Sequence, residues 1–312
     1  MSWELILSVY ILTFLIGLPT NLLSLCAFSI KIHRKATPTD ILLLNLTVSD
    51  LLFLLVLPLK MHEAASHMRW HLPYFLCSVT SFLFFSTIYT SSLLLMAVSV
   101  DRYLGVAFPI RYKLLRKPLY AVAGSAAIWI VSSAHLCFIY IVDQQRTGSP
   151  AHICYDNFSP KQMAIVLPMR LEISIVLCFI PLLVCAFCYL NLILILSKLS
   201  NFGREKKLRA TGMAAGTLLV FVVCFLPFNV THIVGFLHKE SDQWRSYTLL
   251  LSSINSVLDP ITFYFSSSAF QVNMKNILTR GVRSSSMTAL VTLQRNATGT
   301  EARQGQTNPA LQ

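Results

Sequence analysis

Four side chains that carry or can acquire positive charge lie within long apolar stretches of the sequence: His135, Arg170, His232 and Arg245. An arginine binds a carboxylate through two parallel charge-assisted hydrogen bonds, and a histidine can donate one more. Each residue alone has an ordinary explanation, because an arginine near a helix end often extends to the lipid headgroups. Four such groups at one depth on neighbouring helices favour a pocket for a small anion.

Two acidic side chains also lie within apolar stretches. Asp50 ends the sequence Asn-Leu-Thr-Val-Ser-Asp, and Asp259 precedes a proline. A carboxylate inside a membrane is costly, so a pair of them indicates a cation site or a water network; a hydrogen-bonded packing motif is the alternative. We expect Ser91 and Asn255 to complete this network, with a sodium ion as the one candidate cofactor, acting as an allosteric modulator. No catalytic residues are expected, since no nucleophile–base pair or metal-spaced cluster is evident.

These residues must be positioned by helices that cross a membrane. Hydrophobic residues make up 55% of the 312 residues and charged residues only 12%, about half the charge of a soluble domain. This composition excludes a disordered chain and argues against an ordinary soluble enzyme. Apolar stretches long enough to span a bilayer as helices cover residues 5–30, 39–62, 75–100, 118–142, 164–197, 207–237 and 245–265.

The charge distribution predicts how these helices are oriented. The net charge is +12. If the N-terminus lies outside, most Lys and Arg residues fall in the inner loops and the tail, as the positive-inside rule requires. The charge therefore indicates membrane orientation and not nucleic-acid binding. Because only about four residues precede the first apolar stretch, any outside ligand must bind among the helices and loops.

The third apolar stretch ends in Asp101-Arg102-Tyr103. Alone this tripeptide is weak evidence, because Asp101 and Arg102 could simply form a local ion pair. Together with Trp129 and with a proline in each of the last three stretches, the pattern resembles the rhodopsin-like G-protein-coupled receptors. That resemblance implies that Asp101, Arg102 and Tyr103 take part in G-protein coupling. The matching signature residues are Asn21, Asp50, Arg102, Trp129, Pro181, Pro227 and Pro260.

The resemblance also implies the fold class and the domain organisation. It implies an all-α membrane protein, a seven-transmembrane helix bundle over residues 1–266 with the N-terminus outside. A short amphipathic cytoplasmic helix is expected at 267–280, followed by a disordered cytoplasmic tail at 281–312. Two positions depart from the commonest family pattern: Phe225 stands in place of tryptophan, and the usual Asn-Pro-x-x-Tyr reads Asp259-Pro260-Ile-Thr-Phe263. The details of the activation switch therefore do not follow from the resemblance.

Four segments are similar to the free fatty acid receptors, specifically the short-chain types two and three: residues 17–23, 102–109, 166–172 and 229–235. This similarity implies a receptor for acetate, propionate and butyrate that signals through inhibitory or phospholipase C-activating G proteins, or both. It implies that two arginines clamp the carboxylate and two histidines assist. The implied ligand-binding residues are His135, Arg170, His232, Arg245, Tyr89, Glu172 and Phe85.

The resemblance bears on three further features. Cys77 and Cys154 both face the predicted outer side, where a disulfide is plausible, and they match the bridge of the family. Asn157 begins an outer-loop glycosylation sequon. The implied location is the plasma membrane with several spans, and the implied partners are a G protein, arrestin and membrane lipids.

Three alternatives remain open on the sequence. A related receptor could bind another small anion, such as a hydroxy acid or a longer-chain fatty acid. A transporter or channel for small carboxylates is disfavoured, because no internal repeat is found. An intramembrane enzyme lacks a recognisable catalytic cluster. Neither the choice between types two and three nor the G-protein class follows from the residues.

Overall fold

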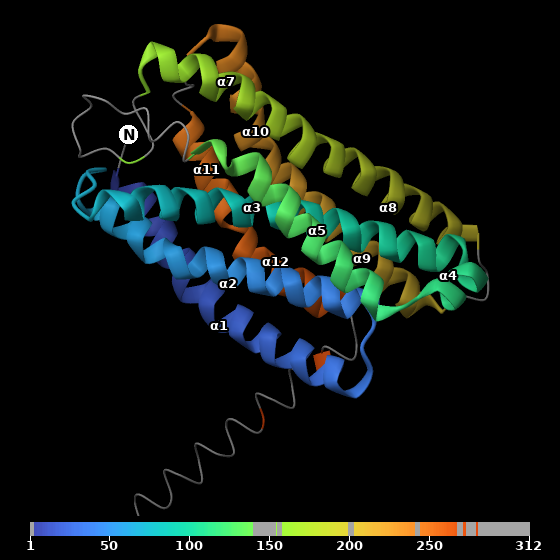
Figure 1. Ribbon diagram of the computed structural model, residues 1–312. Coiled ribbons are helices and arrows are strands. Elements are labelled where there is room, and N and C mark those ends of the chain that lie inside the picture. The colour runs from blue at the N-terminus through green and yellow to red at the C-terminus, as the bar shows by residue number, and fades with distance from the viewer. Residues whose placement is uncertain are drawn as a thin grey trace, which may run out of the picture.

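The computed structural model describes residues 3–139, 154, 158–198, 203–240, 244–266, 271–272 and 279. Almost all of these residues are helical (Figure 1). The helices are α1 (Trp3–Lys35), α2 (Pro38–Ala65), α3 (Tyr74–Ala107), α4 (Pro109–Leu115), α5 (Pro118–Leu136), α7 (Pro160–Ser174), α8 (Ile180–Lys198), α9 (Arg204–Val220), α10 (Leu226–His238), α11 (Arg245–Ser253) and α12 (Asn255–Ser266).

The predicted membrane spans are confirmed, with one change in how the last is built. Within the described residues, six helical stretches are long and apolar enough to cross a membrane. The seventh expected span consists of α11 and α12, which are separated by a turn at Ile254. The short helix α4 was not predicted; a proline at its first position favours a helix start there.

Two of the spans contain a wider π-helical turn just before a proline. The turn η1 (Ile175–Phe179) joins α7 to α8, and η2 (Phe221–Phe225) joins α9 to α10. Proline removes an N–H and crowds the preceding turn, so carbonyl groups lose their helical partner. Hydroxyl groups of neighbouring helices donate to two of these carbonyls: Ser92 Oγ to Leu177 O at 2.8 Å, and Ser252 Oγ to Cys224 O at 2.7 Å.

Buried polar contacts join the helices to one another. Asn21 Nδ2 of α1 donates to Ser256 O of α12 at 2.7 Å. The hydroxyl groups of Thr90 in α3 and Ser132 in α5 lie 2.6 Å apart. Small residues allow the close approach: a Cβ at Gly17 would lie 3.1 Å from a methyl group of α2. Such contacts hold transmembrane helices together because lipid provides no hydrophobic force between them.

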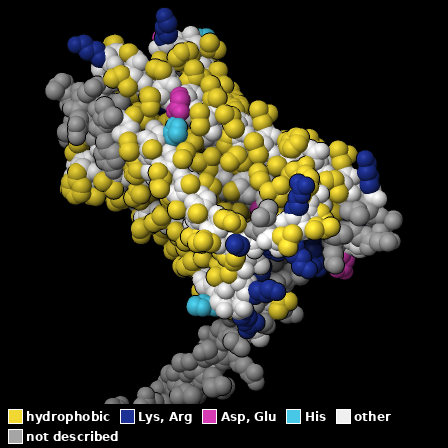
Figure 2. Space-filling model, turned by 45° about the vertical axis from the view of Figure 1, so that its right-hand side comes forward, with side chains coloured by type: hydrophobic (Ala, Val, Ile, Leu, Met, Phe, Trp, Pro, Cys, Tyr) yellow, Lys and Arg dark blue, Asp and Glu magenta, His cyan; other side chains and the backbone are white. Residues whose placement is uncertain are grey.

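Hydrophobic side chains cover most of the face seen in Figure 2, and the Lys and Arg side chains on it gather toward the two ends of the bundle. The two ends of the bundle can be told apart by their residues. We call the end that holds Cys77 and Cys154 the disulfide end, and the end that holds Asp101 and Arg102 the Arg102 end. Helix α1 begins at the disulfide end, and α4 lies at the opposite end (Figure 1).

Candidate ligand-binding site

A small cavity lies between the end of α5 and helices α3, α7, α10 and α11, toward the disulfide end. It brings together five residues that the sequence analysis singled out from distant parts of the chain: Phe85, Tyr89, Arg170, His232 and Arg245. The remaining lining residues are apolar apart from the backbone, and the sequence analysis did not identify them. They are Leu136, Phe138, Ile139, Ile173 and Phe228.

Arg245 is the first residue of α11 and only 9% exposed. Its guanidinium carbon lies 5.9 Å from the centre of the Phe85 ring and 5.8 Å from that of Phe228. The two rings are nearly parallel, with their centres 6.2 Å apart. Such contacts fix a cation without using its N–H donors. Its Nε is buried and has no hydrogen-bond partner among the described residues, so a donor is left for a ligand.

Arg170 belongs to α7, shortly before the π-helical turn η1. It is 5% exposed, and its guanidinium carbon lies 5.2 Å from the centre of the Phe158 ring. A capping box at Ser159 and Gln162 fixes where α7 begins, and so sets the direction in which Arg170 points. None of the ten lining residues is an aspartate or a glutamate.

Hydrogen bonds and ring contacts orient the other polar lining residues. The Tyr89 hydroxyl donates to Asn229 Oδ1 at 3.2 Å, and Asn229 Nδ2 donates to Phe225 O at 2.9 Å. The His232 ring packs edge-on against Phe228, with the centres 4.5 Å apart. Asn229 was missed as a site residue, although it begins the segment 229–235 that is similar to the free fatty acid receptors and lies one helical turn after Phe225.

His135 and Glu172 do not line this cavity. His135 Nε2 lies 3.0 Å from Glu172 Oε1, and the two side chains are 27% and 40% exposed. The other ring nitrogen, Nδ1, lies 2.7 Å from Val131 O. The pair joins α5 to α7 at the partly exposed edge of the bundle, so the structure places both residues beside the cavity and not in its wall.

The cavity is very small. The space open to the centre of a water molecule is about 20 Å³, and roughly 10–15 Å³ is enough for one water. Rings and branched side chains line it, so an occupant can have only a few heavy atoms unless the walls move.

The predicted disulfide between Cys77 and Cys154 is present, with the two Cα atoms 5.6 Å apart. Cys77 lies in the first turn of α3, and Cys154 lies in the segment that precedes α7. The bond therefore attaches Cys154 to the first turn of α3, the helix that also carries the cavity residue Phe85.

The acidic pair lies deep in the bundle. Asp50 is 1% exposed and Asp259 is fully buried. One oxygen of Asp50 and both oxygens of Asp259 have no hydrogen-bond partner among the described residues. Ser91 and Asn255 are buried as well, and Ser91 Oγ donates to Ser49 Oγ at 3.1 Å. Buried carboxylate oxygens without a hydrogen-bond partner are suited to bind a small cation or water.

At the Arg102 end, Asp101 is held by residues other than Arg102. Its carboxylate accepts hydrogen bonds from Thr39 Oγ1 and from the Tyr112 hydroxyl, the latter at 2.6 Å. Burial, followed by this hydrogen bond, raises the pKa of Tyr112 well above its ordinary value, so the phenol keeps its proton. Tyr103 packs edge-on against aromatic rings of α8 and of the α3–α4 junction. The local Asp101–Arg102 ion pair is not among the salt bridges of the described residues.

Several predictions fall outside the described residues. Asn157 lies there, as do the expected tail at 281–312 and most of the expected helix at 267–280.

Comparison with known proteins confirms the resemblance. The family described as 7 transmembrane receptor (rhodopsin family) matches residues 20–263. Free fatty acid receptor 3 of Mus musculus is 46% identical over 288 residues, which cover 90% of this chain and 89% of that protein. Free fatty acid receptor 2 of Homo sapiens is 48% identical over 276 residues, covering 86% and 83%. Free fatty acid receptor 1 of Macaca fascicularis is 33% identical over 275 residues, covering 83% and 90%.

These relatives are receptors and not enzymes, and the family with its several membrane-spanning helices identifies a multi-pass protein of the plasma membrane. The chain belongs to the rhodopsin family of seven-transmembrane receptors and, within it, to the free fatty acid receptors.

Proposed function

We propose that this receptor is activated by extracellular short-chain carboxylates, namely acetate, propionate and butyrate. One observation carries the proposal: two buried guanidinium groups and a histidine line one small cavity that contains no acidic residue. The positive-inside charge pattern and the disulfide support an arrangement in which the disulfide end faces outside.

The electrostatics of the cavity favour an anion. Two cations in a small, largely apolar space repel each other, and a carboxylate between them relieves this repulsion while accepting hydrogen bonds from both. A short-chain acid is ionised at pH 7, because its carboxyl resembles that of glutamate, with a pKa of about 4.3. Arg170 and Arg245 hold the carboxylate, His232 adds a donor, and Phe85 limits the length of the chain.

The cavity size favours short acids over the alternatives. A longer acyl chain has no room unless the wall moves, since about 20 Å³ is open. A hydroxy acid needs an additional polar partner, and the hydroxyl of Tyr89 already donates to Asn229. A ligand with so few atoms gains at most about 1.5 kcal/mol of binding free energy per heavy atom. This limit implies micromolar to millimolar affinity.

Binding at this site has a structural route to the Arg102 end. The cavity residues lie on helices that contain the π-helical turns η1 and η2 and their prolines. These are places where a helix bends most easily. A ligand that favours one bend of α9–α10 changes the access to Arg102, where an inhibitory or phospholipase C-activating G protein binds; arrestin binds the phosphorylated tail.

The acidic pair is a candidate for allosteric control by sodium. Asp50 and Asp259, with Ser91 and Asn255, offer oxygen ligands that fit a small cation. We expect Asp50→Asn to abolish any effect of sodium on acetate affinity, measured against potassium at equal ionic strength. If the sodium effect is unchanged in this variant, the acidic pair does not bind sodium and takes part only in a water network.

The central test uses cells that express the receptor. Inhibition of cAMP and release of calcium are recorded for acids from formate to hexanoate, with lactate and succinate alongside. We expect acetate, propionate and butyrate to be active. Arg170→Lys and Arg245→Lys should each lose at least tenfold in potency, because lysine provides neither a fork of donors nor ring stacking.

Arg69→Ala is the matched control, since Arg69 is an exposed arginine at the same end that does not line the cavity. All variants are compared at equal surface expression. If both lysine variants respond like the wild type, the two arginines do not hold the carboxylate. If only lactate or succinate activates, the receptor binds a different class of anion.

A further inference from the structure

A second and much larger cavity lies at the Arg102 end, between α2, α3, α4 and α5. Its volume is about 600 Å³, within the usual range for ligand pockets. It shares no residue with the carboxylate cavity. Part of its wall is exposed on the outer surface of the bundle, at Leu104, Tyr120 and Gly124, so the cavity opens sideways toward the lipid.

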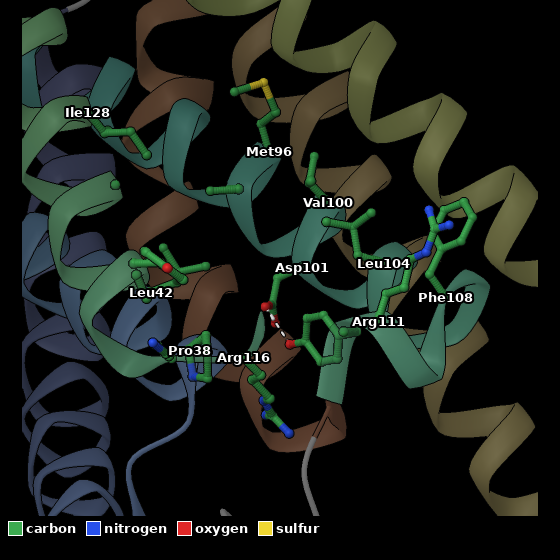
Figure 3. Close-up of a pocket in the computed structure, with 16 residues that line it drawn as sticks. Pro38, Leu42, Met96, Val100, Asp101, Leu104, Phe108, Arg111, Arg116 and Ile128 are labelled. Carbon is green, nitrogen blue, oxygen red and sulfur yellow. Dashed lines mark hydrogen bonds between the residues drawn. The ribbon is translucent and has the colours of Figure 1, made fainter. Parts of the chain in front are cut away.

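The two ends of this cavity differ in chemistry. Met96 and Ile128 lie at the end toward the middle of the bundle, whereas Arg116 lies at the other end (Figure 3). Arg111 and Lys117 also line the wall, close in sequence to Arg116. Three basic side chains therefore border an otherwise largely apolar groove.

The length of the apolar part suits one lipid leaflet. Leu104 and Met96 both line the groove on α3. Eight residues of helix separate them, about 12 Å at 1.5 Å per residue. One leaflet contributes roughly half of the ~30 Å hydrocarbon core. An acyl chain that lies along α3 would thus place its headgroup beside the basic residues.

The single acidic residue of the wall does not neutralise them. Asp101 accepts hydrogen bonds from Thr39 and Tyr112. The guanidinium carbon of Arg116 lies 5.3 Å from the centre of the Tyr112 ring. A headgroup held by Arg116 would therefore be linked through Tyr112 to the Asp101 carboxylate (Figure 3).

We propose that this groove binds one anionic glycerophospholipid from the surrounding leaflet. Its phosphate is held by Arg116, while Arg111 and Lys117 add positive charge elsewhere along the wall, and one acyl chain lies between α3 and α5. Basic pockets between transmembrane helices favour such headgroups, because a phosphate and an acidic headgroup supply more acceptors than a single carboxylate. The bound lipid steadies α4 through the contact between Arg116 and Tyr112. This proposal does not depend on the carboxylate ligand.

The test is native mass spectrometry of the full-length receptor, purified with mixed phosphatidylcholine and phosphatidylserine. We expect one phosphatidylserine to be retained per receptor. Arg116→Gln should weaken its binding about fivefold, because each basic residue near a lipid surface is worth about 1 kcal/mol. Lys113→Gln is the matched control, since Lys113 is exposed on the same short helix but does not line the groove.

A second pair of variants tests the groove itself. A Cβ at Gly124 would meet open space, and so would one at Gly212 in α9. Gly124→Trp fills the groove and should abolish retention, whereas Gly212→Trp should not. The proposal is overturned if Gly124→Trp and Gly212→Trp retain phosphatidylserine equally well. It is also overturned if Arg116→Gln and Lys113→Gln retain it equally well. If oleate competes as well as phosphatidylserine, the groove is a fatty-carboxylate site and the phospholipid assignment is wrong.

Discussion

Phe85 should set the length of the acid that the carboxylate cavity accepts. It lines the cavity, is 8% exposed, and stacks parallel to Phe228. Replacing it with alanine removes a whole ring from the wall and opens space beside Arg245. We expect Phe85→Ala to shift the preference of the receptor from propionate toward hexanoate.

The size of this shift follows from the ligand. Each buried methylene contributes up to about 0.8 kcal/mol. Hexanoate has three more methylenes than propionate, so the potency ratio of the two acids should change by up to about fiftyfold. Acetate gains nothing from the new space and loses the ring contact at Arg245. It should become about fivefold less potent, since that contact is worth about 1 kcal/mol.

The assay is inhibition of cAMP over the series from acetate to hexanoate at matched surface expression. Phe82→Ala is the control, because Phe82 lies on the same helix, is partly buried and does not line the cavity. A hexanoate-to-propionate ratio that stays at the wild-type value refutes the reasoning. So does an equal shift in the control, which would indicate general loosening of α3.

Three further changes test other parts of the structure. Tyr112→Phe removes a hydrogen bond to the Asp101 carboxylate; it should lower thermal stability by about 1 kcal/mol and speed amide exchange in α4. Gly17→Val forces a larger side chain against α2 and should cost about 1–3 kcal/mol, seen as a lower unfolding midpoint in detergent. A double-mutant cycle between His135 and Glu172 should give a coupling below about 1 kcal/mol that declines with salt, as expected for a partly exposed pair.

Each of these has a control or a contradicting outcome. Gly212→Val has open space around its new side chain and should leave the midpoint nearly unchanged, so an equal loss there would contradict the packing argument. Unaltered exchange in α4 would mean that Tyr112 does not hold this helix. A coupling that is large and independent of salt would show that the His135–Glu172 pair is effectively buried.

Much of the fold could be predicted from the sequence because the signals are local. A helix that crosses lipid must satisfy its own backbone and expose apolar side chains, so its position can be read from the sequence. The exact course of the helices could not be read in the same way. Pro181 and Pro227 can be recognised in the sequence as helix breakers, but the π-helical turns before them depend on hydroxyl groups from α3 and α11.

The candidate site was only partly predictable for a similar reason. Arg170, Arg245 and His232 can be identified from the sequence as candidates to bind a carboxylate, since they are donors that carry or can acquire positive charge in apolar surroundings. Which of the candidates share a cavity depends on how each helix is rotated about its axis, and this is set by the packing of the whole bundle. This rotation places Arg245 beside the rings of Phe85 and Phe228 and leaves His135 paired with Glu172 outside the wall.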